Sequence, residues 1–523
     1  MKRNWLIIAV SIMLIVSNFS VSVGYSLKIK NTDPSLQGLS LLFYPEENNP
    51  FNYICVLSGD TLVINQKISG IVHERFESSW VQYPVKAKAK IDISFKKNKE
   101  VGDRKVESLM LVFAIVRKDD SSLEKLSATV PVLFPGQFPD GYKNNVKGWG
   151  NISKDQLHSC LPDGTAKLFT MDFDKGNKCS LRCKHCFRRD DRVDSPCAKF
   201  LTHEKILGYV KEAKSLGLQE IKILGRGEPF EDSRFLEFLR EVSDMGISIA
   251  VFTKGHVLGC DDLARKYNKQ YGIKTGWELI QALKELNVSI LLGFNSFNRL
   301  MQEKFVGVDK FSEKNLLKNY VAFRDQALTN LVKAGFNDYV EGEATRLAMI
   351  AAPCKPENID EMLSMYQWGR VRNIYTLTCP TNICGKGVDE FEREKEFQDY
   401  ILKLEDVWAQ MYIWAIQKNL ISLETFLEDG VSLYPGCHPC NQTAAGFYLH
   451  LSGQTNLCPG RKEIFCEDIR KVGLKKAWAE SANYKRAKFG SKYNYHCVAR
   501  DGYSLPLNFY QEIETKVLNA LQS

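Results

Sequence analysis

Three cysteines at short spacing are the residues of this chain best suited to chemistry. Cys179, Cys183 and Cys186 lie in the segment CSLRCKHCF. Three thiolates on one short loop can bind one face of a compact iron–sulfur cluster, which is normally held by four cysteines. Three ligands leave one iron without a protein ligand, and an open coordination position is typical of catalytic rather than structural metal sites. The spacing therefore predicts a catalytic cluster.

Other metal chemistry stays open at the same residues. Cys197, which follows Pro196, is an alternative fourth ligand, and four ligands would make the cluster an electron carrier. Cys160 is also near, but it does not continue the spacing. Structural zinc on the same thiolates is a further alternative.

The elements that must position these cysteines are strands alternating with helices. The expected strands are KLFTMDF, EIKIL, ISIAVFT, VSILLGF, TRLAMIA and VRNIYTL, and amphipathic segments such as HEKILGYVKEAKSLG separate them. Six strands with intervening helices predict a parallel sheet with right-handed crossovers, either barrel-like or doubly wound. In both architectures ligands bind beyond the carboxyl ends of the strands.

Polar motifs follow four successive strands of this pattern. The cysteine group follows the first strand, GRGEP the second, TKGH the third and NSFN the fourth. Because the carboxyl ends of parallel strands meet at one edge of a sheet, these motifs are predicted to form one site.

CxxxCxxC after the first strand of a six-fold βα domain resembles the radical S-adenosylmethionine (radical SAM) superfamily. The resemblance implies a partial (βα)6 barrel over residues 165–385. It also implies a [4Fe–4S] cluster on Cys179, Cys183 and Cys186, whose open iron chelates the amino and carboxylate groups of S-adenosylmethionine. An electron donor would reduce the cluster, and cleavage of S-adenosylmethionine would release a 5′-deoxyadenosyl radical.

A second motif, Gly225-Arg226-Gly227-Glu228-Pro229, is similar to the Gly-Gly-Glu-Pro strand end of that superfamily. Glycines let the backbone approach a ligand, and a carboxylate can pair with the ligand's ammonium group. Arg226 departs from the family pattern, which has glycine there.

Further cofactor contacts are implied by the same resemblance. His185 stands where the family usually has an aromatic residue, and Thr253 opens a turn similar to the family's Thr-Asn-Gly turn. Asn295 and Ser296 fall where the family contacts the ribose or carboxylate, and Arg346 is a candidate carboxylate partner. For all but His185, a plain turn or surface role is the alternative.

A second cysteine group lies in residues 431–523, which are expected to form a small Cys-rich extension. The spacing from Cys440 through Gly453 to Cys458 is similar to the opening of the SPASM extension, the auxiliary-cluster domain of many radical enzymes. The compact CxxC-x5-C-x3-C block of that extension is missing, so one auxiliary iron–sulfur cluster is expected. Its expected ligands are Cys440, Cys458, Cys466 and Cys497, with Cys437 as a competitor. Zinc or disulfides are the alternatives.

Between barrel and extension, residues 386–430 are expected to form a helical linker. Cys379 and Cys384 flank the end of the sixth expected strand and are expected to be ordinary thiols.

The N-terminal part of the chain has a different pattern. Residues 1–24 carry Lys2 and Arg3 ahead of the apolar run Trp5–Val16, which predicts a secretory signal peptide or an uncleaved membrane anchor. The protein is therefore expected to be exported or membrane-associated, on a side that the flanking charges leave open. Residues 25–140 contain seven short expected strands, ending with ATVPVLF, and predict an accessory β-sandwich.

The whole chain is expected to be a multidomain radical SAM enzyme of unidentified substrate. The resemblance favours a peptide or protein substrate. The net charge of +8 is spread over 523 residues, so no nucleic-acid partner is expected. The alternative function is an exported or membrane-bound iron–sulfur protein that transfers electrons or binds metal without S-adenosylmethionine chemistry.

Overall fold

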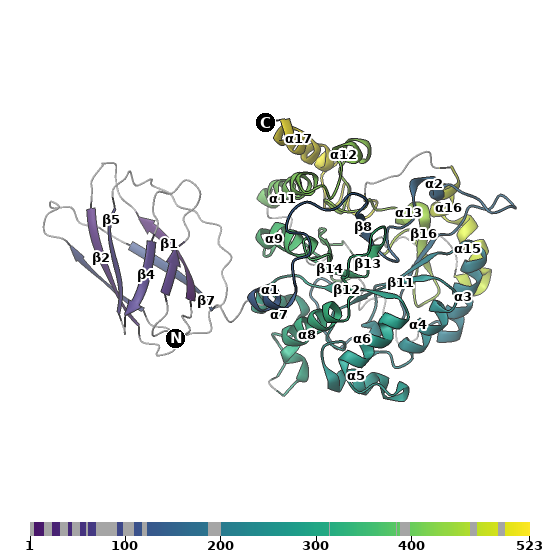
Figure 1. The fold of residues 1–523 in the computed structure, drawn as a ribbon, viewed down its shortest axis with the longest axis horizontal. Coiled ribbons are helices and arrows are strands. Elements are labelled where there is room, and N and C mark those ends of the chain that lie inside the picture. The colour runs from purple at the N-terminus through teal and green to yellow at the C-terminus, as the bar shows by residue number, and fades with distance from the viewer. Residues whose placement is uncertain are drawn as a thin grey trace. The chain divides into compact units, whose positions relative to one another are not determined.

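The computed structural model divides the chain into two compact units, Met1–Ser121 and Ser122–Ser523 (Figure 1). In the first unit the described residues are those of its seven strands. In the second unit they are 123–186, 200–312, 314–382, 384–387, 398–460, 468–489 and 497–522.

The first unit is a single seven-stranded sheet. Its strands are β1 (Trp5–Leu14), β2 (Val23–Asn31), β3 (Ser40–Phe43), β4 (Tyr53–Ser58), β5 (Thr61–Ile68), β6 (Ile91–Lys97) and β7 (Leu109–Arg117). The sheet order is β6-β2-β5-β4-β3-β1-β7, and neighbours are antiparallel except for the β1–β3 pair. Six of the seven expected strand segments coincide with β2 to β7. The stacking of two sheets into a sandwich stays a prediction.

The apolar part of the expected leader is strand β1, which pairs with β7 along its length. Among the residues that the structure describes, no helix has both the length and the apolar character that crossing a membrane requires. Residues 1–4 and 15–22 lie outside the described part, so cleavage or anchoring of the leader stays a prediction.

The last expected strand, ATVPVLF, is not a strand. The chain forms helix α1 (Leu123–Thr129) and then an irregular segment. Leu126, Val130 and Phe134 are buried in the core of the second unit, and Arg372 Nε donates to the Val130 carbonyl at 3.0 Å. Burial against this unit overrides the strand propensity of the segment. Residues 122–140 therefore belong with the barrel rather than with the N-terminal strands.

Six parallel strands form the centre of the second unit, as predicted. They are β9 (Thr170–Phe173), β10 (Glu220–Ile223), β11 (Ser248–Thr253), β12 (Val288–Gly293), β14 (Leu347–Ile350) and β15 (Tyr375–Leu377), hydrogen-bonded in this order. Helices α3 (His203–Ser215), α4 (Phe235–Ser243), α6 (Gly276–Glu285), α8 (Tyr320–Lys333) and α9 (Ile359–Arg370) connect them. Five of these strands are buried at every residue and β11 at most, because helices cover the outer face and side chains fill the inner one.

Local signals explain where the connecting helices begin. Thr202 caps α3 by accepting from the Lys205 amide. Thr275 and Glu278 form a complete capping box on α6. Shorter elements complete the barrel: β8 (Lys143–Val146), α2 (Lys154–Leu157), α5 (Asp261–Asn268), α7 (Arg299–Val306) and β13 (Ala344–Thr345).

The C-terminal extension continues the barrel sheet. After α11 (Gln398–Gln417) and α12 (Leu423–Asp429), which lie in the expected helical linker, come α13 (Gln442–Ala445), β16 (Gly446–Leu449) and β17 (Thr455–Asn456). Strand β16 pairs in parallel with β9, from Gly446 opposite Thr170 to Leu449 opposite Phe173. A Cβ at Gly446 would lie 1.7 Å from the Thr170 carbonyl oxygen, so only glycine permits this pairing. The helices α14 (Ile469–Val472), α15 (Leu474–Glu480), α16 (Ala482–Phe489) and α17 (Phe509–Gln522) follow.

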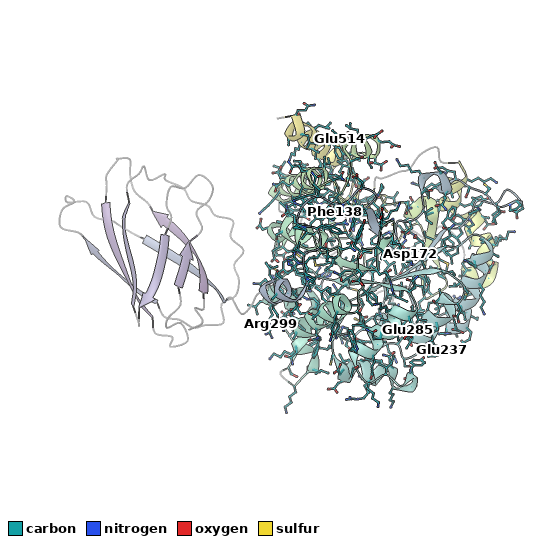
Figure 2. The ribbon with its side chains drawn as sticks, in the orientation of Figure 1. Phe138, Asp172, Glu237, Glu285, Arg299 and Glu514 are labelled. Carbon is teal, nitrogen blue, oxygen red and sulfur yellow. The ribbon has the colours of Figure 1, made fainter. Side chains whose placement is uncertain are left out.

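A buried lysine of the barrel pairs with an aspartate and also bonds to the extension. Asp172, labelled in Figure 2, lies on β9, and its Oδ1 is 2.8 Å from Lys222 Nζ on β10. Lys222 also donates to Gln442 Oε1 at 2.8 Å, on α13 of the extension. Burial raises the pKa of Asp172 to about 6, against the opposing charge of Lys222.

Candidate active site

The three cysteines of the sequence motif lie on a loop that directly follows β9. This cysteine loop, residues 176–186, carries Cys179, Cys183 and Cys186 as half-buried thiols that form no disulfide. Cys179 and Cys183 pack against an apolar cluster that includes Leu181 and Tyr320. Burial, together with the charges of Cys183, Glu228 and Glu231, raises the pKa of Cys179 far above its usual range. Such thiols ionise when a metal binds them, because the metal supplies the opposite charge.

Glu231 attaches the cysteine loop to the ends of two further strands. Its carboxylate accepts from the Ser180 amide at 3.1 Å, the Ser180 hydroxyl at 3.0 Å and His256 Nε2 at 2.8 Å. Although burial opposes ionisation, these donors and the charge of His256 hold the pKa of Glu231 below its usual value. Glu231 was not predicted as a site residue, since a glutamate after Gly-Glu-Pro has no distinguishing spacing.

The Gly-Glu-Pro segment contacts the backbone of the cysteine loop. Gly225 and Gly227 have φ of +117° and +82°, conformations that favour glycine. The Glu228 amide donates to the Lys178 carbonyl at 2.7 Å. A Cβ on Gly227 would lie 2.8 Å from the Gly176 carbonyl oxygen, so this approach requires glycine.

Glu228 and Thr253 also meet. The Thr253 hydroxyl donates to Glu228 Oε1 at 2.6 Å, and the Lys254 amide donates to Oε2 at 2.9 Å. Glu228 is buried, and this burial raises its pKa above the usual value. The structure thus brings the ends of β9, β10 and β11 together, as the strand-end pattern predicted.

His185 lies near two ammonium groups. Burial, with the charges of Lys254 and Lys355, lowers its pKa well below the usual range, so its ring is neutral. Lys254 Nζ donates to Asn295 Oδ1 at 3.2 Å, which places Asn295 beside this group. Neither lysine was predicted as a site residue, although Lys254 stands inside the TKGH motif.

Ser296 is held by hydrogen bonds to other residues of the barrel. It is fully buried, and its hydroxyl lies 2.7 Å from Glu361 Oε1 on α9. The Asn295 and Ser296 amides both donate to Gln302 Oε1, at 2.7 and 3.1 Å. These bonds fix the turn after β12 while directing the Ser296 side chain towards α9.

Arg346 lies elsewhere, which corrects its assignment as a carboxylate partner. Its guanidinium donates to the carbonyls of Leu283, Lys284 and Val288 at 2.8–3.2 Å. Val288 is the first residue of β12, so Arg346 lies at the opposite end of the strands from the cysteine loop. There it satisfies carbonyls at the end of α6.

The structure separates Cys437 from the other expected auxiliary ligands that it describes. Cys437 faces β15, since Arg370 donates to its sulfur at 2.6 Å and its thiol donates to the Thr376 carbonyl at 3.3 Å. Cys440, Cys458 and Cys497 are near one another, because the charge of Cys497 raises the pKa of Cys440 and of Cys458, and Cys440 also raises that of Cys458. Cys466 and Cys197 lie outside the described residues.

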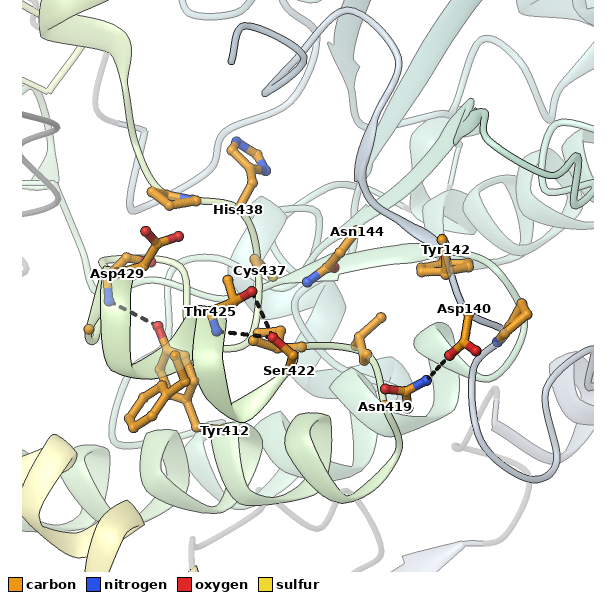
Figure 3. A pocket seen from close by; sticks show the side chains of 18 residues that line it. Asp140, Tyr142, Asn144, Tyr412, Asn419, Ser422, Thr425, Asp429, Cys437 and His438 are labelled. Atoms are coloured by element: carbon orange, nitrogen blue, oxygen red, sulfur yellow. Dashed lines mark hydrogen bonds between the residues drawn. The ribbon is translucent and has the colours of Figure 1, made fainter. Parts of the chain in front are cut away.

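A cavity of about 410 Å³ lies apart from the cysteine loop (Figure 3). Asp140, Tyr142 and Asn144 line one side, and Asn419 and Ser422 line another. No residue of the cysteine loop, as far as the structure describes it, contributes to this lining.

Comparison with known proteins identifies the family of the barrel. The model of the radical SAM superfamily matches residues 174–350. These residues belong to the radical SAM superfamily. The match starts at the end of β9 and covers the cysteine loop and the strand ends gathered around it, so the family resemblance seen in the motifs is confirmed. The match supports the conclusion that the protein is an iron–sulfur-dependent enzyme.

Curated relatives match parts of this chain. A GTP 3′,8-cyclase of Clostridium perfringens (strain SM101 / Type A) is 29% identical over 85 residues, 16% of this chain and 26% of the relative. A probable GTP 3′,8-cyclase of Pyrococcus horikoshii is 26% identical over 161 residues, 31% of this chain and 46% of the relative. The chain thus spans between a quarter and a half of the length of these relatives.

Two solved structures have distant similarity. Streptococcus suis SuiB bound to its precursor peptide SuiA is 14% identical, with a TM-score of 0.38, over 64% of this chain and 68% of SuiB. BtrN in complex with AdoMet and 2-DOIA is 9% identical, with a TM-score of 0.27, over 62% of this chain and 86% of BtrN. At these scores the two resemblances do not indicate a substrate.

The thiols of the radical SAM domain fit the cluster that the superfamily implies. Three thiols on one loop, none of them in a disulfide, provide soft sulfur ligands suited to iron–sulfur clusters. They lie against an apolar surface, which limits solvent at such a site.

Proposed function

We propose that this chain is a radical SAM enzyme that reductively cleaves S-adenosylmethionine and acts on an unidentified substrate. Cys179, Cys183 and Cys186 would hold a [4Fe–4S] cluster. When bound, this cluster supplies the electron that cleaves the sulfonium and yields a 5′-deoxyadenosyl radical. An external electron donor is required.

The residues around the cysteine loop have separate tasks in this proposal. Glu228, oriented by Thr253 and the Lys254 amide, would accept the ammonium group of S-adenosylmethionine. Lys254 and Lys355 place positive charge near His185, where they would attract a carboxylate of the cofactor or substrate. Glu231 and His256 keep the loop in position.

The observation that carries the proposal is the convergence of three strand ends on the cysteine loop. Backbone and side-chain hydrogen bonds join Lys178 and Ser180 to Glu228 and Glu231. A structural zinc knuckle needs its thiolates alone. Here the loop also contacts Glu228, whose carboxylate is buried, and the charges of Lys254 and Lys355 act on His185, which is expected of a cofactor site.

The test is anaerobic cluster reconstitution followed by assays of bound iron and of 5′-deoxyadenosine under strong reductant. The variant Cys179→Ala/Cys183→Ala/Cys186→Ala should lose about four irons per chain and all 5′-deoxyadenosine formation. Cys160→Ala, which removes an exposed thiol, is the matched control and should retain both. Product formation that survives the triple change would refute the proposal.

The second candidate function is an iron–sulfur electron carrier without S-adenosylmethionine chemistry. Cys197 as a fourth ligand would favour it. A carrier would take up iron yet form no 5′-deoxyadenosine, so the same assay separates the two functions.

Three finer proposals accompany the main one. A peptide or protein is the substrate class that a SPASM-like extension favours. One auxiliary iron–sulfur cluster would be bound by thiolates of this extension, among them Cys440, Cys458 and Cys497. The N-terminal segment would direct export or membrane association, which sequencing of the mature N-terminus and protease access would test.

A further inference from the structure

Cys379 is a barrel residue that meets the thiols of the extension. It follows β15, the sixth parallel strand, and its carbonyl accepts from the Cys354 amide at 2.8 Å. By sequence it is 61 residues before Cys440. Neither spacing nor motif connects it with the C-terminal cysteines, and it was expected to be an ordinary thiol.

Buried Arg500 joins Cys379 to Cys497. One guanidinium nitrogen lies 3.5 Å from the Cys379 sulfur and another lies 3.4 Å from the Cys497 sulfur. The same guanidinium donates to the Pro380 carbonyl at 2.9 and 3.1 Å, so it fixes the turn that carries Cys379. Two thiols are therefore held on either side of one positive charge.

Packing brings the Cys458 segment to the same place. A Cβ on Gly460 would lie 2.8 Å from Asn382 Oδ1 and 3.1 Å from the Ala499 Cβ. The loop after β15, the turn after Cys458 and the segment after Cys497 thus meet. Gly460 leaves the space that this contact requires.

Cys440 completes the group, which we call the Arg500 thiol group: Cys379, Cys440, Cys458 and Cys497. The pKa values of these thiols are linked as expected of near neighbours. After burial, the Cys497 thiol is the next cause that raises the pKa of Cys440 and of Cys458. Tyr434 is buried among them, since Cys440, Cys379 and Cys497 all act on its hydroxyl. None of the four sulfurs is in a disulfide.

We propose that Cys379, together with Cys440, Cys458 and Cys497, binds the auxiliary iron–sulfur cluster, so that the barrel itself supplies one of its four ligands. Four thiolates are the usual ligand set of a cubane, and Cys466 is then not required. Arg500 donates hydrogen bonds to two of the ligand sulfurs, an interaction that stabilises thiolate charge and raises the reduction potential. The inference rests on the auxiliary cluster of the proposed function, and it adds the barrel ligand and the role of Arg500.

The test uses the variant Cys179→Ala/Cys183→Ala/Cys186→Ala as background, where only auxiliary iron remains. Adding Cys379→Ala should remove most of the remaining iron and its visible absorption after anaerobic reconstitution, whereas adding Cys466→Ala should leave both unchanged. Cys384→Ala and Cys437→Ala are matched controls, because both thiols are buried and lie beside the group without belonging to it. Iron unchanged by Cys379→Ala but lost with Cys466→Ala would overturn the proposal, as would zinc in place of iron.

A second measurement needs no cysteine substitution in the Arg500 thiol group. Anaerobic alkylation with peptide mapping should label its four cysteines only after a chelator has removed iron, and label Cys384 and Cys437 equally before and after. Labelling of Cys379 in the iron-loaded protein would contradict the assignment.

Arg500→Gln should keep the iron of the auxiliary cluster and lower the reduction potential of that cluster. If the unsubstituted protein forms no 5′-deoxyadenosine, only the proposed function is refuted. The iron content, the alkylation pattern and the reduction potential do not depend on cleavage of S-adenosylmethionine.

Discussion

The cysteine loop and the Arg500 thiol group both gather sulfur atoms, but the chain builds them differently. The loop has its three thiols within eight residues after one strand. The Arg500 thiol group draws four thiols from four segments between Cys379 and Cys497. The loop is held from outside by the Glu228 amide and the Glu231 carboxylate, whereas two thiols of the other group contact a buried guanidinium.

These differences indicate different chemistry at the two places. Three ligands and nearby ionisable groups leave room for a cofactor to bind metal and protein together. Four thiolates around a fixed positive charge saturate a cluster and suit it to electron transfer or to structure. If both proposals hold, one chain combines an open cluster site with a closed one.

The largest effect is expected from Gly227→Ala. The new Cβ would lie within 3.0 Å of the Gly176 and Lys178 carbonyl oxygens, so the cysteine loop must move. Iron at the loop and 5′-deoxyadenosine formation should fall by at least tenfold, while auxiliary iron is retained. Gly246→Ala is the matched control, because Gly246 also has a positive φ, +68°, but has no atom near its Cβ position. Equal losses in both variants would mean that backbone strain alone was responsible.

A smaller effect is expected from Glu228→Gln. The amide keeps the size of the side chain but loses the charge that would pair with an ammonium group. Loss of one charged hydrogen bond, worth about 1.5–3 kcal/mol, corresponds to roughly 10- to 100-fold weaker binding of S-adenosylmethionine. Calorimetric titration of the reconstituted protein measures this. Glu361→Gln removes another buried carboxylate, bound to Ser296, and should leave cofactor affinity within a few-fold of the original.

The smallest effect concerns the rates of iron loss. A chelator can attack the open iron at the cysteine loop directly, but it must displace a thiolate from a cluster with four ligands. Iron release from the reconstituted protein should therefore have two phases, and the fast phase should be absent when Cys179, Cys183 and Cys186 are alanine. A single phase, or loss of the slow phase in that variant, would remove the distinction between open and closed sites.

Much of the active-site region was predictable because its signals are local. Cys179, Cys183 and Cys186 are close in sequence, and Gly227, Glu228 and Thr253 directly follow or end strands with clear hydrophobic patterns. Parallel strands place such ends side by side, so pattern and topology together predict their meeting. Arg346 was misassigned because strand membership does not reveal at which end of the barrel a long side chain finds its partners.

Other features depended on contacts between distant segments. ATVPVLF has strand-forming residues, yet it forms the end of helix α1 and an irregular segment, from which Val130 and Phe134 are buried in the second unit. The extension was expected as a separate domain, but β16 adds to the free edge of β9. Unpaired strand edges attract any segment with matching geometry, and sequence does not say which one will bind.

The sequence by itself determined the cysteine loop and the alternation of six strands with helices, because these rest on spacing and periodicity within short stretches, and its motifs resemble those of the radical SAM superfamily. Only the tertiary structure decided that Glu231 and His256 hold the loop, that Lys254 and Lys355 lie near His185, and that Cys379 meets Cys497 across Arg500. Those contacts join residues from different strand ends, and their partners are selected by packing rather than by neighbouring residues.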